Sequence, residues 1–158
     1  MDARSQQGDR KIKVLAASSA GGHWEQLMLL RPALEKFTVV FATSNPQLGE
    51  RHGLRGVLAL PESNRNRPLR VLRCIVHAWR LVREVRPDVV ITTGALPGLL
   101  VLICGRVSGA HTIWLDSVAN SERLSMSGRW ARFFASRWLT QWAPLSGRHG
   151  PEFVGALL

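Results

Sequence analysis

Short apolar runs alternate with longer segments of helical periodicity along almost the whole chain. The runs rich in Val, Ile, Leu and small residues have the continuous apolar character of strands buried on both faces of a sheet. The predicted strands are residues 12–17, 38–43, 57–60, 89–93, 111–115 and 138–142, and the predicted helices are residues 24–37, 68–86, 98–107 and 128–137. Strands and helices in this alternation require right-handed crossovers. The pattern therefore predicts an α/β fold, a Rossmann-like doubly wound parallel sheet.

The segment at residues 68–86 has the clearest helical pattern. At 100° per residue, one side carries Arg70, Arg73, His77, Arg80 and Glu84, and the other carries Leu72, Ile75, Trp79 and Val82. Further arginines precede it at Arg65 and Arg67. Such a helix fits against anionic lipid headgroups. A solvated arginine stripe above a core-facing apolar side explains the pattern equally well, and both interpretations remain open.

The charge of the chain is unusual for its size. Among 158 residues, 21 Lys and Arg stand against 11 Asp and Glu, giving a net charge of +10. An excess of this kind points to a polyanionic partner: nucleic acid, an anionic membrane surface or phosphorylated substrates. Nucleic acid is disfavoured, because the sequence contains no helix-turn-helix, zinc-binding or RNA-recognition pattern and no Tyr. A membrane surface and phosphorylated substrates remain.

The chain ends and the cysteines place further bounds on the fold. Residues 1–11 are polar and are predicted to be a disordered tail, followed by one domain over residues 12–158. Cys74 and Cys104 lie in apolar stretches and are interpreted as small core residues in a reducing compartment. The longest apolar run, residues 95–104, is interrupted by Pro97 and Gly98 and is shorter than the roughly 20 residues that a bilayer requires. We therefore expect any membrane contact to be peripheral.

The loop after the first predicted strand reads Ser18-Ser19-Ala20-Gly21-Gly22-His23. Paired glycines allow backbone amides to approach an anion, and the helix that follows adds a partial positive charge. A tight turn with His23 as a capping residue is the alternative. The spacing differs from G-x-G-x-x-G, the second strand ends in Thr43-Ser44 rather than an acid, and no Gly-Lys-Ser/Thr follows. A dinucleotide site and a Walker A loop are thereby disfavoured.

Small and polar residues also follow the later strands, at the edge where parallel sheets bind ligands. These segments are Thr92-Thr93-Gly94-Ala95-Leu96-Pro97-Gly98, Asp116-Ser117-Val118-Ala119-Asn120, Leu124-Ser125-Met126-Ser127-Gly128-Arg129 and Leu139-Thr140-Gln141-Trp142-Ala143-Pro144-Leu145. Helix capping and turn chemistry are the alternative for Asp116-Ser117 and Ser127-Gly128. The four loops together predict one ligand site.

In this order and spacing the motifs resemble the acceptor-side subunits of split UDP-sugar glycosyltransferases. That family includes the anchoring subunit of the dolichol-pathway N-acetylglucosaminyltransferase and bacterial half-proteins of exopolysaccharide and capsule synthesis. Its Ser-x-Gly-Gly-His is met by residues 19–23, its acid-Ser-x-Ala and Leu-Ser-x-Ser-Gly by residues 116–119 and 124–128, and its Gln-Trp-x-x-Leu by residues 141–145. The chain departs from the family pattern at Gly94-Ala95-Leu96-Pro97-Gly98, where many members have Gly-Pro-Gly, and at Asp116 and Asn120, where the eukaryotic form has Glu and Arg. These departures favour a bacterial polysaccharide enzyme.

The resemblance implies the N-terminal half of a GT-B fold, the architecture of two Rossmann domains. This half would bind a lipid-linked acceptor, and a separate donor-binding subunit would bind UDP-N-acetylglucosamine or a related UDP-hexose or uronic acid. The C-terminal segment at residues 153–158 would pass toward that partner, or else form a last strand or helix on its own core. The place of action would be the cytoplasmic face of the inner membrane, bound peripherally. We expect no cofactor, no metal and no nucleic acid.

The residues that we expect to form the site follow from these loops and the resemblance. His23 and Asp116 are the candidate catalytic residues, because they are the ionisable side chains placed to act as a base toward an acceptor hydroxyl. The expected acceptor-binding residues are Ser19, Gly21, Gly22, His23, Gly94, Gly98, Asp116, Ser117, Ser125, Ser127, Gly128 and Gln141. A non-catalytic scaffold that recruits the donor-binding subunit to the membrane is the alternative function.

Overall fold

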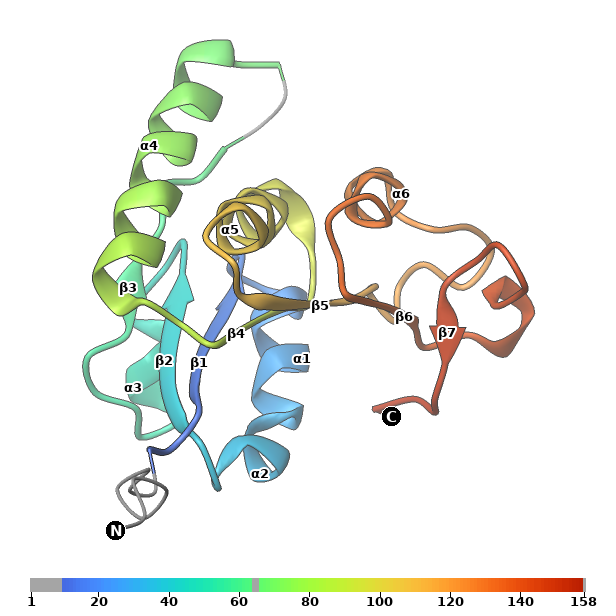
Figure 1. The fold of residues 1–158 in the computed structure, drawn as a ribbon, viewed down its shortest axis with the longest axis horizontal. Helices are drawn as coiled ribbons and strands as arrows, with labels where there is room; N and C mark the ends of the chain where they lie inside the picture. Colours follow the sequence, from blue (N-terminus) through green and yellow to red (C-terminus); the bar gives the residue numbers. More distant parts are fainter. Residues whose placement is uncertain (1–9, 64–65, 158) are drawn as a thin grey trace, which may run out of the picture.

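Parallel strands form one sheet in the order β3-β2-β1-β4-β5-β6-β7 (Figure 1). The computed structural model describes residues 10–63 and 66–157. The strands are β1 (Lys13–Ser18), β2 (Thr38–Thr43), β3 (Leu58–Ala59), β4 (Val89–Thr92), β5 (His111–Leu115), β6 (Arg137–Thr140) and β7 (Glu152–Phe153). From β1 the chain adds β2 and β3 on one side of β1, and then crosses back to add β4 on the other side of β1. The carboxyl ends of β1 and β4 are therefore the topological switch point, where open α/β sheets bind ligands.

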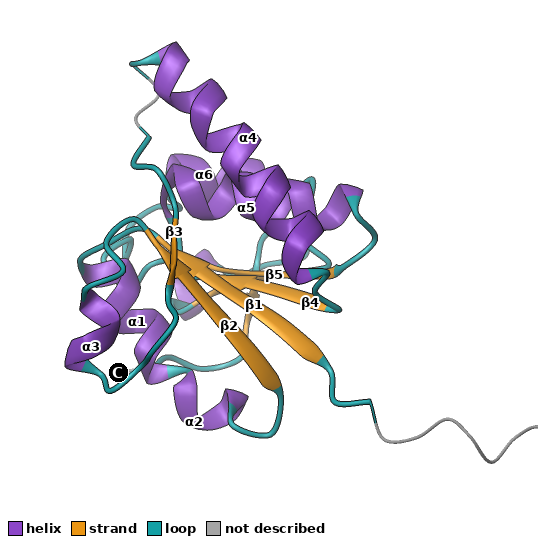
Figure 2. Cartoon of the chain, turned by 90° about the vertical axis from the view of Figure 1, so that its left-hand side faces the viewer, coloured by secondary structure: helices purple, strands orange, loops and turns teal. Residues whose placement is uncertain are grey.

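Helices cover both faces of the sheet (Figure 2). They are α1 (Gly22–Leu29), α2 (Arg31–Leu34), α3 (Leu48–Arg51), α4 (Pro68–Val85), α5 (Ala95–Val107) and α6 (Met126–Ala131), with the 3₁₀ turn η1 (Ala143–Leu145) before β7. In Figure 2, α4, α5 and α6 lie on one side of the sheet and α1, α2 and α3 on the other. The predicted Rossmann-like doubly wound sheet is confirmed.

The hydrophobic core lies on both faces of the sheet, and alternate side chains of β1 contribute to each face. Leu15 and Ala17 point toward the cluster under α4 and α5, whereas Val14 and Ala16 point toward the cluster under α1. Successive strand residues face opposite sides, so a central strand that is covered on both sides reads as a continuous apolar run. The α1 side is anchored by Trp24, which is fully buried against Phe41 in an edge-to-face contact. Both ends of the loop that follows β1 are thus held by core residues.

Several predicted element bounds differ from the observed ones. The helix predicted at residues 24–37 is divided, since α1 ends at Leu29 and α2 begins at Arg31, where Pro32 lies in the first turn and needs no intrahelical N–H partner. The helix predicted at residues 98–107 begins earlier, at Ala95, and that predicted at 128–137 is the shorter α6. Residues 152–153 form β7 on the edge of the sheet.

The ends of the chain are described only in part. Residues 1–9, most of the tail predicted to be disordered, lie outside the described residues, as does Leu158. Phe153 pairs with β6 in the sheet, and Val154 beyond it is exposed. Of the described residues of the C-terminal segment, only Phe153 lies in a strand, and it is exposed rather than packed on the core, so both alternatives that the sequence left remain open.

The two faces of α4 differ from the sequence-based expectation. Its core-facing residues are Cys74, Ala78, Leu81, Val82 and Val85. Leu72, Ile75 and Trp79 from the predicted apolar side are exposed instead, so that side faces the core only at Val82. Leu69 is 81% exposed and Leu72 is 58% exposed. Arg70, Arg73 and Arg80 are exposed and the core-facing side is apolar, as the solvated-stripe interpretation expected, but that side is formed by other residues than predicted. The exposed apolar side chains also leave the membrane interpretation open.

The two cysteines are core residues, as predicted. Cys74 and Cys104 are buried free thiols in the cluster beneath α4 and α5. Burial raises the pKa of Cys104 to about 11, with the neighbouring Cys74 adding to the effect. Both thiols therefore stay protonated at neutral pH and pack as small apolar groups. Of the helices that the described residues form, none is both long and apolar enough to span a bilayer.

Candidate active site at the sheet switch point

His23 is clamped to the end of β4 by two reciprocal hydrogen bonds. Its Nδ1 lies 2.9 Å from the carbonyl oxygen of Thr93, and the Thr93 hydroxyl donates to the His23 carbonyl oxygen over 2.6 Å. A carbonyl oxygen only accepts, so Nδ1 must carry the hydrogen and donate it. In the neutral ring this leaves Nε2 with its lone pair. The clamp therefore holds His23 in the tautomer that a general base requires.

Gly94 makes the close approach of His23 possible. A Cβ at this position would lie 2.5 Å from both Nδ1 and Cε1 of the imidazole. The backbone of Gly94 also has φ 135°, and Ala95 after it has φ 62°, so the turn into α5 lies in the left-handed region. Gly98 also has no room for a side chain, because a Cβ there would collide with the Thr92 hydroxyl. The two glycines are required by packing within the site, and their role toward an acceptor stays a prediction.

The loop from Ser19 to Gly21 leads directly into α1 and His23. Gly21 has φ 77° and precedes α1, whose N-terminus makes no side-chain capping hydrogen bond. Among the described residues, no atom would lie within 4 Å of a Cβ at Gly21 or Gly22. The Ala20 amide is held by the Ser44 hydroxyl at 2.9 Å, which fixes the loop to the end of β2. Gly21 and Gly22 are exposed and no side chain caps the first amides of α1, as binding of an anion requires.

Asp116 is held in a separate network at the end of β5. Asp116 is only 1% exposed, and both of its carboxylate oxygens accept hydrogen bonds from Ser125. The backbone amide donates over 2.9 Å and the hydroxyl over 2.6 Å. The Ser125 hydroxyl in turn accepts from the Gly128 amide at 2.8 Å and caps α6. Capping was the alternative for Asp116-Ser117 and Ser127-Gly128, but the capping residue is Ser125, which Asp116 supports. The catalytic role of Asp116 stays a prediction.

Gly128 is necessary for this arrangement. A Cβ at Gly128 would lie 2.8 Å from both the Asp116 Oδ1 and the Ser125 Oγ. The structure therefore brings Asp116, Ser125 and Gly128 together, with Ser127 half-buried in the first turn of α6. None of the hydrogen bonds within the described residues joins this cluster directly to the His23 side chain. The two candidate catalytic residues lie in different networks.

A buried row of amide side chains joins α1 to the ends of β5 and β6. Gln26 donates to the Ser117 hydroxyl at 3.0 Å, and Gln141 donates to Gln26 at 2.8 Å and to the Asp116 carbonyl oxygen at 3.0 Å. Gln26 also accepts from the Val118 amide at 3.1 Å. Ser117 and Gln141 were expected in the site, whereas Gln26 was not. The feature that could have pointed to Gln26 is its place among the buried residues of α1, between Trp24 and Leu27, where a polar side chain needs partners.

Buried polar groups of this kind are costly unless every partner is present, so they specify one arrangement of the elements that they join. Gln26 and Gln141 fix the start of the loop after β5 against α1, whose first residues include His23. The Trp142 indole adds a further link, since it donates to the Val118 carbonyl oxygen at 2.7 Å. The network therefore holds the loops after β5 and β6 in a fixed position relative to α1.

Comparisons with solved structures agree with this fold. No model of a known protein family matches the chain. No curated protein sequence matches it either. The structure of MurG from Acinetobacter baumannii superposes with a TM-score of 0.72 at 11% identity, covering 90% of this chain and 45% of MurG. UDP-GlcNAc 2-epimerase from Neisseria meningitidis, solved with UDP-GlcNAc bound, gives 0.64 at 10% identity, with 82% and 40% covered.

A glycosyltransferase from Rickettsia africae gives a TM-score of 0.54 at 14% identity and covers 78% of this chain and 34% of that one. The chain thus spans less than half the length of each of these three structures. It is an α/β domain with the Rossmann-like architecture of one half of the GT-B fold. Its neighbours in structure are GT-B proteins that include glycosyltransferases and a UDP-GlcNAc epimerase.

Proposed function

We propose that this chain is the acceptor-binding subunit of a two-component UDP-sugar glycosyltransferase. The acceptor is a polyprenyl-diphosphate-linked saccharide of bacterial polysaccharide synthesis, and the donor is UDP-N-acetylglucosamine or a related UDP-hexose or uronic acid. The observation that carries the proposal is the Nδ1–H tautomer of His23, held by Thr93 at the switch point of a GT-B-type domain. The motifs at residues 19–23, 116–128 and 141–145 supply the link to split transferases.

Direct transfer from a UDP-sugar needs a base at the acceptor hydroxyl and stabilisation of the departing diphosphate. In this scheme His23 Nε2 takes the proton of the acceptor hydroxyl as that oxygen attacks the anomeric carbon and the bond to UDP breaks. The open amides at the start of α1 and the glycines at Gly21 and Gly22 face the acceptor's own phosphates. Stabilisation of the UDP leaving group falls to the donor-binding half.

The donor-binding half is proposed to be a separate polypeptide. The solved GT-B structures are more than twice as long as the part that matches this chain, and a second Rossmann domain makes up the rest of that fold. The resemblance of the motifs to split transferases supports assigning that domain to a partner subunit. The direct experiment is a transfer assay in which each chain is supplied alone and then together.

A non-catalytic scaffold remains the second candidate function. One observation favours it: the buried Asp116 carboxylate is fully engaged by Ser125, so one of the two candidate catalytic residues serves the structure of the loop. In that case the subunit would recruit the donor-binding partner to the membrane and contribute no base. The two candidates differ in what the loss of His23 does to turnover.

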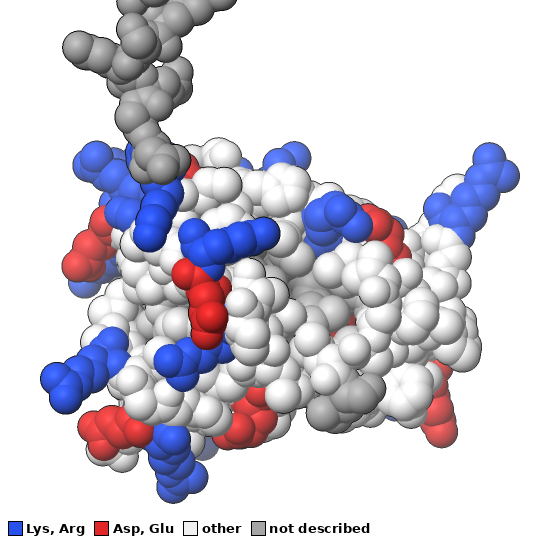
Figure 3. Space-filling model, turned by 90° about the horizontal axis from the view of Figure 1, so that it is seen from below, with Lys and Arg blue, Asp and Glu red and all other residues white. Residues whose placement is uncertain are grey.

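We further propose that the face with α4, α5 and α6 lies against an anionic membrane, at the cytoplasmic side of the inner membrane. Large apolar side chains are exposed on all three helices of this face, namely Leu69, Leu72, Val76, Trp79, Val107 and Trp130, and at Phe133 in the turn after α6. The first turns of α4 project past the sheet (Figures 1 and 2). Seen from the side of α1 and α2, acidic and basic side chains are interspersed around a largely uncharged centre (Figure 3).

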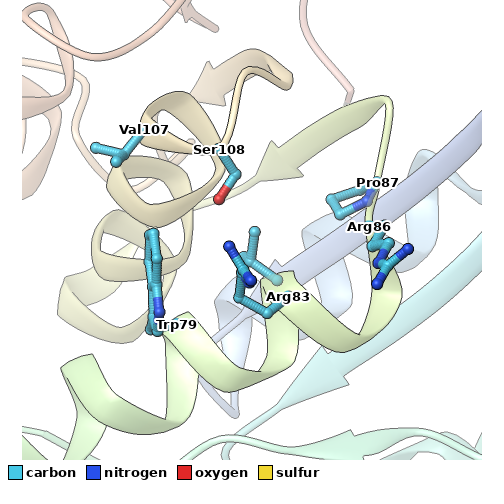
Figure 4. Close-up of a pocket in the computed structure, with 7 residues that line it drawn as sticks. Trp79, Arg83, Arg86, Pro87, Val107 and Ser108 are labelled. Atoms are coloured by element: carbon cyan, nitrogen blue, oxygen red, sulfur yellow. The ribbon is translucent and has the colours of Figure 1, made fainter.

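A cavity at the C-terminal ends of α4 and α5 supports this orientation (Figure 4). It has a volume of about 550 Å³, and Trp79, Val107, Arg83 and Arg86 are among the residues that line it. The Arg83 guanidinium lies 5.9 Å from the centre of the Trp79 ring. Indole and guanidinium groups side by side suit the boundary between acyl chains and anionic headgroups.

The membrane proposal predicts that Leu69→Asn with Leu72→Asn weakens binding to phosphatidylglycerol vesicles by at least about tenfold. Each leucine contributes about 1.5–3 kcal/mol when its side chain leaves water completely. Sedimentation with vesicles measures the effect. Leu29→Asn is the matched control, because Leu29 is also an exposed helical leucine but lies on α1, on the other face. Equal losses in the control and the α4 variant would contradict the proposed orientation.

A further inference from the structure

A second hollow lies at the same edge of the sheet as His23. Its volume is about 350 Å³, and its walls include Ser19 after β1, Glu62 after β3, Arg67 and Arg70 at the start of α4, and Ala95 at the start of α5. An adjoining hollow of about 420 Å³ shares Glu62 and Arg70 and extends along α4 to Arg73 and His77. Both hollows lie between α4 and residues 59–63, and we call the two together the Arg70 groove.

The Arg70 groove begins beside the candidate base. Ala95, in its wall, directly follows Gly94, the residue against which the imidazole of His23 packs. Ser19, which also lines the groove, belongs to the loop that leads into Gly21 and α1. The groove therefore joins the switch point of the sheet to the projecting end of α4.

The charge in the groove favours an anion. Arg67 and Arg70 are exposed, and none of the salt bridges among the described residues involves either guanidinium. The Glu62 carboxylate also lines the groove, so one acid stands against Arg67, Arg70 and Arg73. Guanidinium groups remain charged at every physiological pH and bind phosphate oxygens through two parallel hydrogen bonds. The net charge left in the groove is positive and suits a phosphorylated ligand.

Apolar side chains stand directly next to these arginines on α4. Leu69 and Leu72 flank Arg70 in the sequence and are 81% and 58% exposed. They continue around the helix into Val76 and Trp79, which are also exposed. The order along this edge is thus the base, then the cationic groove, then an exposed apolar surface. A molecule with a hydroxyl-bearing sugar, a diphosphate and a hydrocarbon chain has the same order.

We infer that Arg67 and Arg70, together with the Ser19 hydroxyl, bind the diphosphate of an isoprenyl-diphosphate-linked acceptor. This inference rests on the proposed function and names the groups that would hold its substrate. The isoprenyl chain leaves the groove across Leu69 and Leu72 toward the bilayer. In this arrangement α4 has two roles, since its basic side holds the phosphates and its apolar side meets the membrane. The amides at Gly21 and Gly22 are then left for the phosphate closer to the sugar.

Farnesyl diphosphate, a soluble isoprenyl diphosphate, tests the inference by calorimetric titration of the whole chain. We expect Arg67→Ala and Arg70→Ala each to weaken its binding by about ten- to hundredfold, because each removes charge-assisted hydrogen bonds. Arg80→Ala is the matched control: Arg80 is exposed on the same helix and lines neither hollow. Circular dichroism checks that all three variants are folded.

Inorganic pyrophosphate and UDP distinguish the sources of the diphosphate. We expect pyrophosphate to bind more weakly than farnesyl diphosphate, and Leu69→Asn with Leu72→Asn to remove that difference. Equal affinity of the wild-type chain for pyrophosphate, UDP and farnesyl diphosphate would overturn the assignment to a lipid. Farnesyl diphosphate binding that Arg67→Ala and Arg70→Ala leave intact would overturn the role of the groove while leaving the proposed function standing. Failure of the proposed function is detected separately, by the transfer assay with the donor-binding partner.

Discussion

Replacing His23 with alanine is expected to lower sugar transfer by the assembled two-subunit enzyme by about 10²- to 10⁴-fold, the usual contribution of a general base. The Nδ1 hydrogen bond to Thr93 leaves Nε2 as the proton acceptor, and the variant lacks this group. Steady-state turnover with saturating donor measures the loss. His111→Ala is the control, because His111 is an exposed histidine at the opposite, amino-terminal edge of the sheet.

His23→Asn separates the base from the clamp. An asparagine amide retains a hydrogen-bond donor toward Thr93 but is not a base, so the stability is expected to persist while turnover is lost. Adding Asp116→Ala addresses the scaffold alternative. That change removes both acceptors of Ser125 and is expected to lower the free energy of unfolding by about 1–3 kcal/mol, measured by urea denaturation. Turnover that survives in the folded double variant His23→Ala, Asp116→Ala would rule out catalysis by this chain.

Gly94→Ala is expected to lower both stability and turnover, because it displaces the His23 ring. Its Cβ would lie 2.5 Å from the His23 ring, so the imidazole must move, and φ 135° becomes strained for a residue with a side chain. Strain of this kind costs about 1–3 kcal/mol of stability. A displacement of about 1 Å in a catalytic group is expected to lower turnover by about a hundredfold. Urea denaturation and turnover give the two values.

Gly109→Ala is the matched control for this variant. Gly109 has φ 88°, and a Cβ there would meet no atom of the described residues within 4 Å. It is therefore expected to lose stability through backbone strain alone and to keep its turnover. If Gly94→Ala loses only as much activity as Gly109→Ala, then the position of the His23 ring does not govern catalysis.

Most strands could be predicted from the sequence because a strand buried on both faces is a continuous apolar run. The bounds of β2 and β5 agree with the predicted residues 38–43 and 111–115. Helix ends were harder to predict. The short α3 (Leu48–Arg51) has too few residues to show helical periodicity, and the break after Leu29 comes before Pro32, since proline fits the first turn of the next helix.

Which side of α4 is buried could not be read from its periodicity. Apolar residues occupy most of the circumference of this helix, and the contacts of Cys74, Ala78 and Val85 with the sheet and α5 decide which of them face the core. The sequence pattern therefore separated the arginines from the apolar residues correctly but assigned Leu72 and Trp79 to the wrong environment. The exposed apolar surface is a property of the packing.

The site was predicted in outline and missed in part. The order of the strands brings the loops of His23 and Gly94 together, as expected for a parallel sheet with its switch point after the first strand. That Ser125 would occupy both oxygens of Asp116 depends on the path of the loop between two residues nine positions apart, which spacing does not reveal. Gln26 was missed because a single glutamine within a helix gives no signal of its partners at Ser117 and Gln141.

The central claim is that this chain supplies the acceptor half of a divided active site. Transfer from radiolabelled UDP-N-acetylglucosamine or a related UDP-sugar to a polyprenyl-diphosphate-linked saccharide tests it most directly, with this chain and the donor-binding chain purified separately. We predict that neither chain transfers sugar alone and that the mixture does. Transfer by the donor-binding chain without this one, at the rate of the mixture, would contradict the claim.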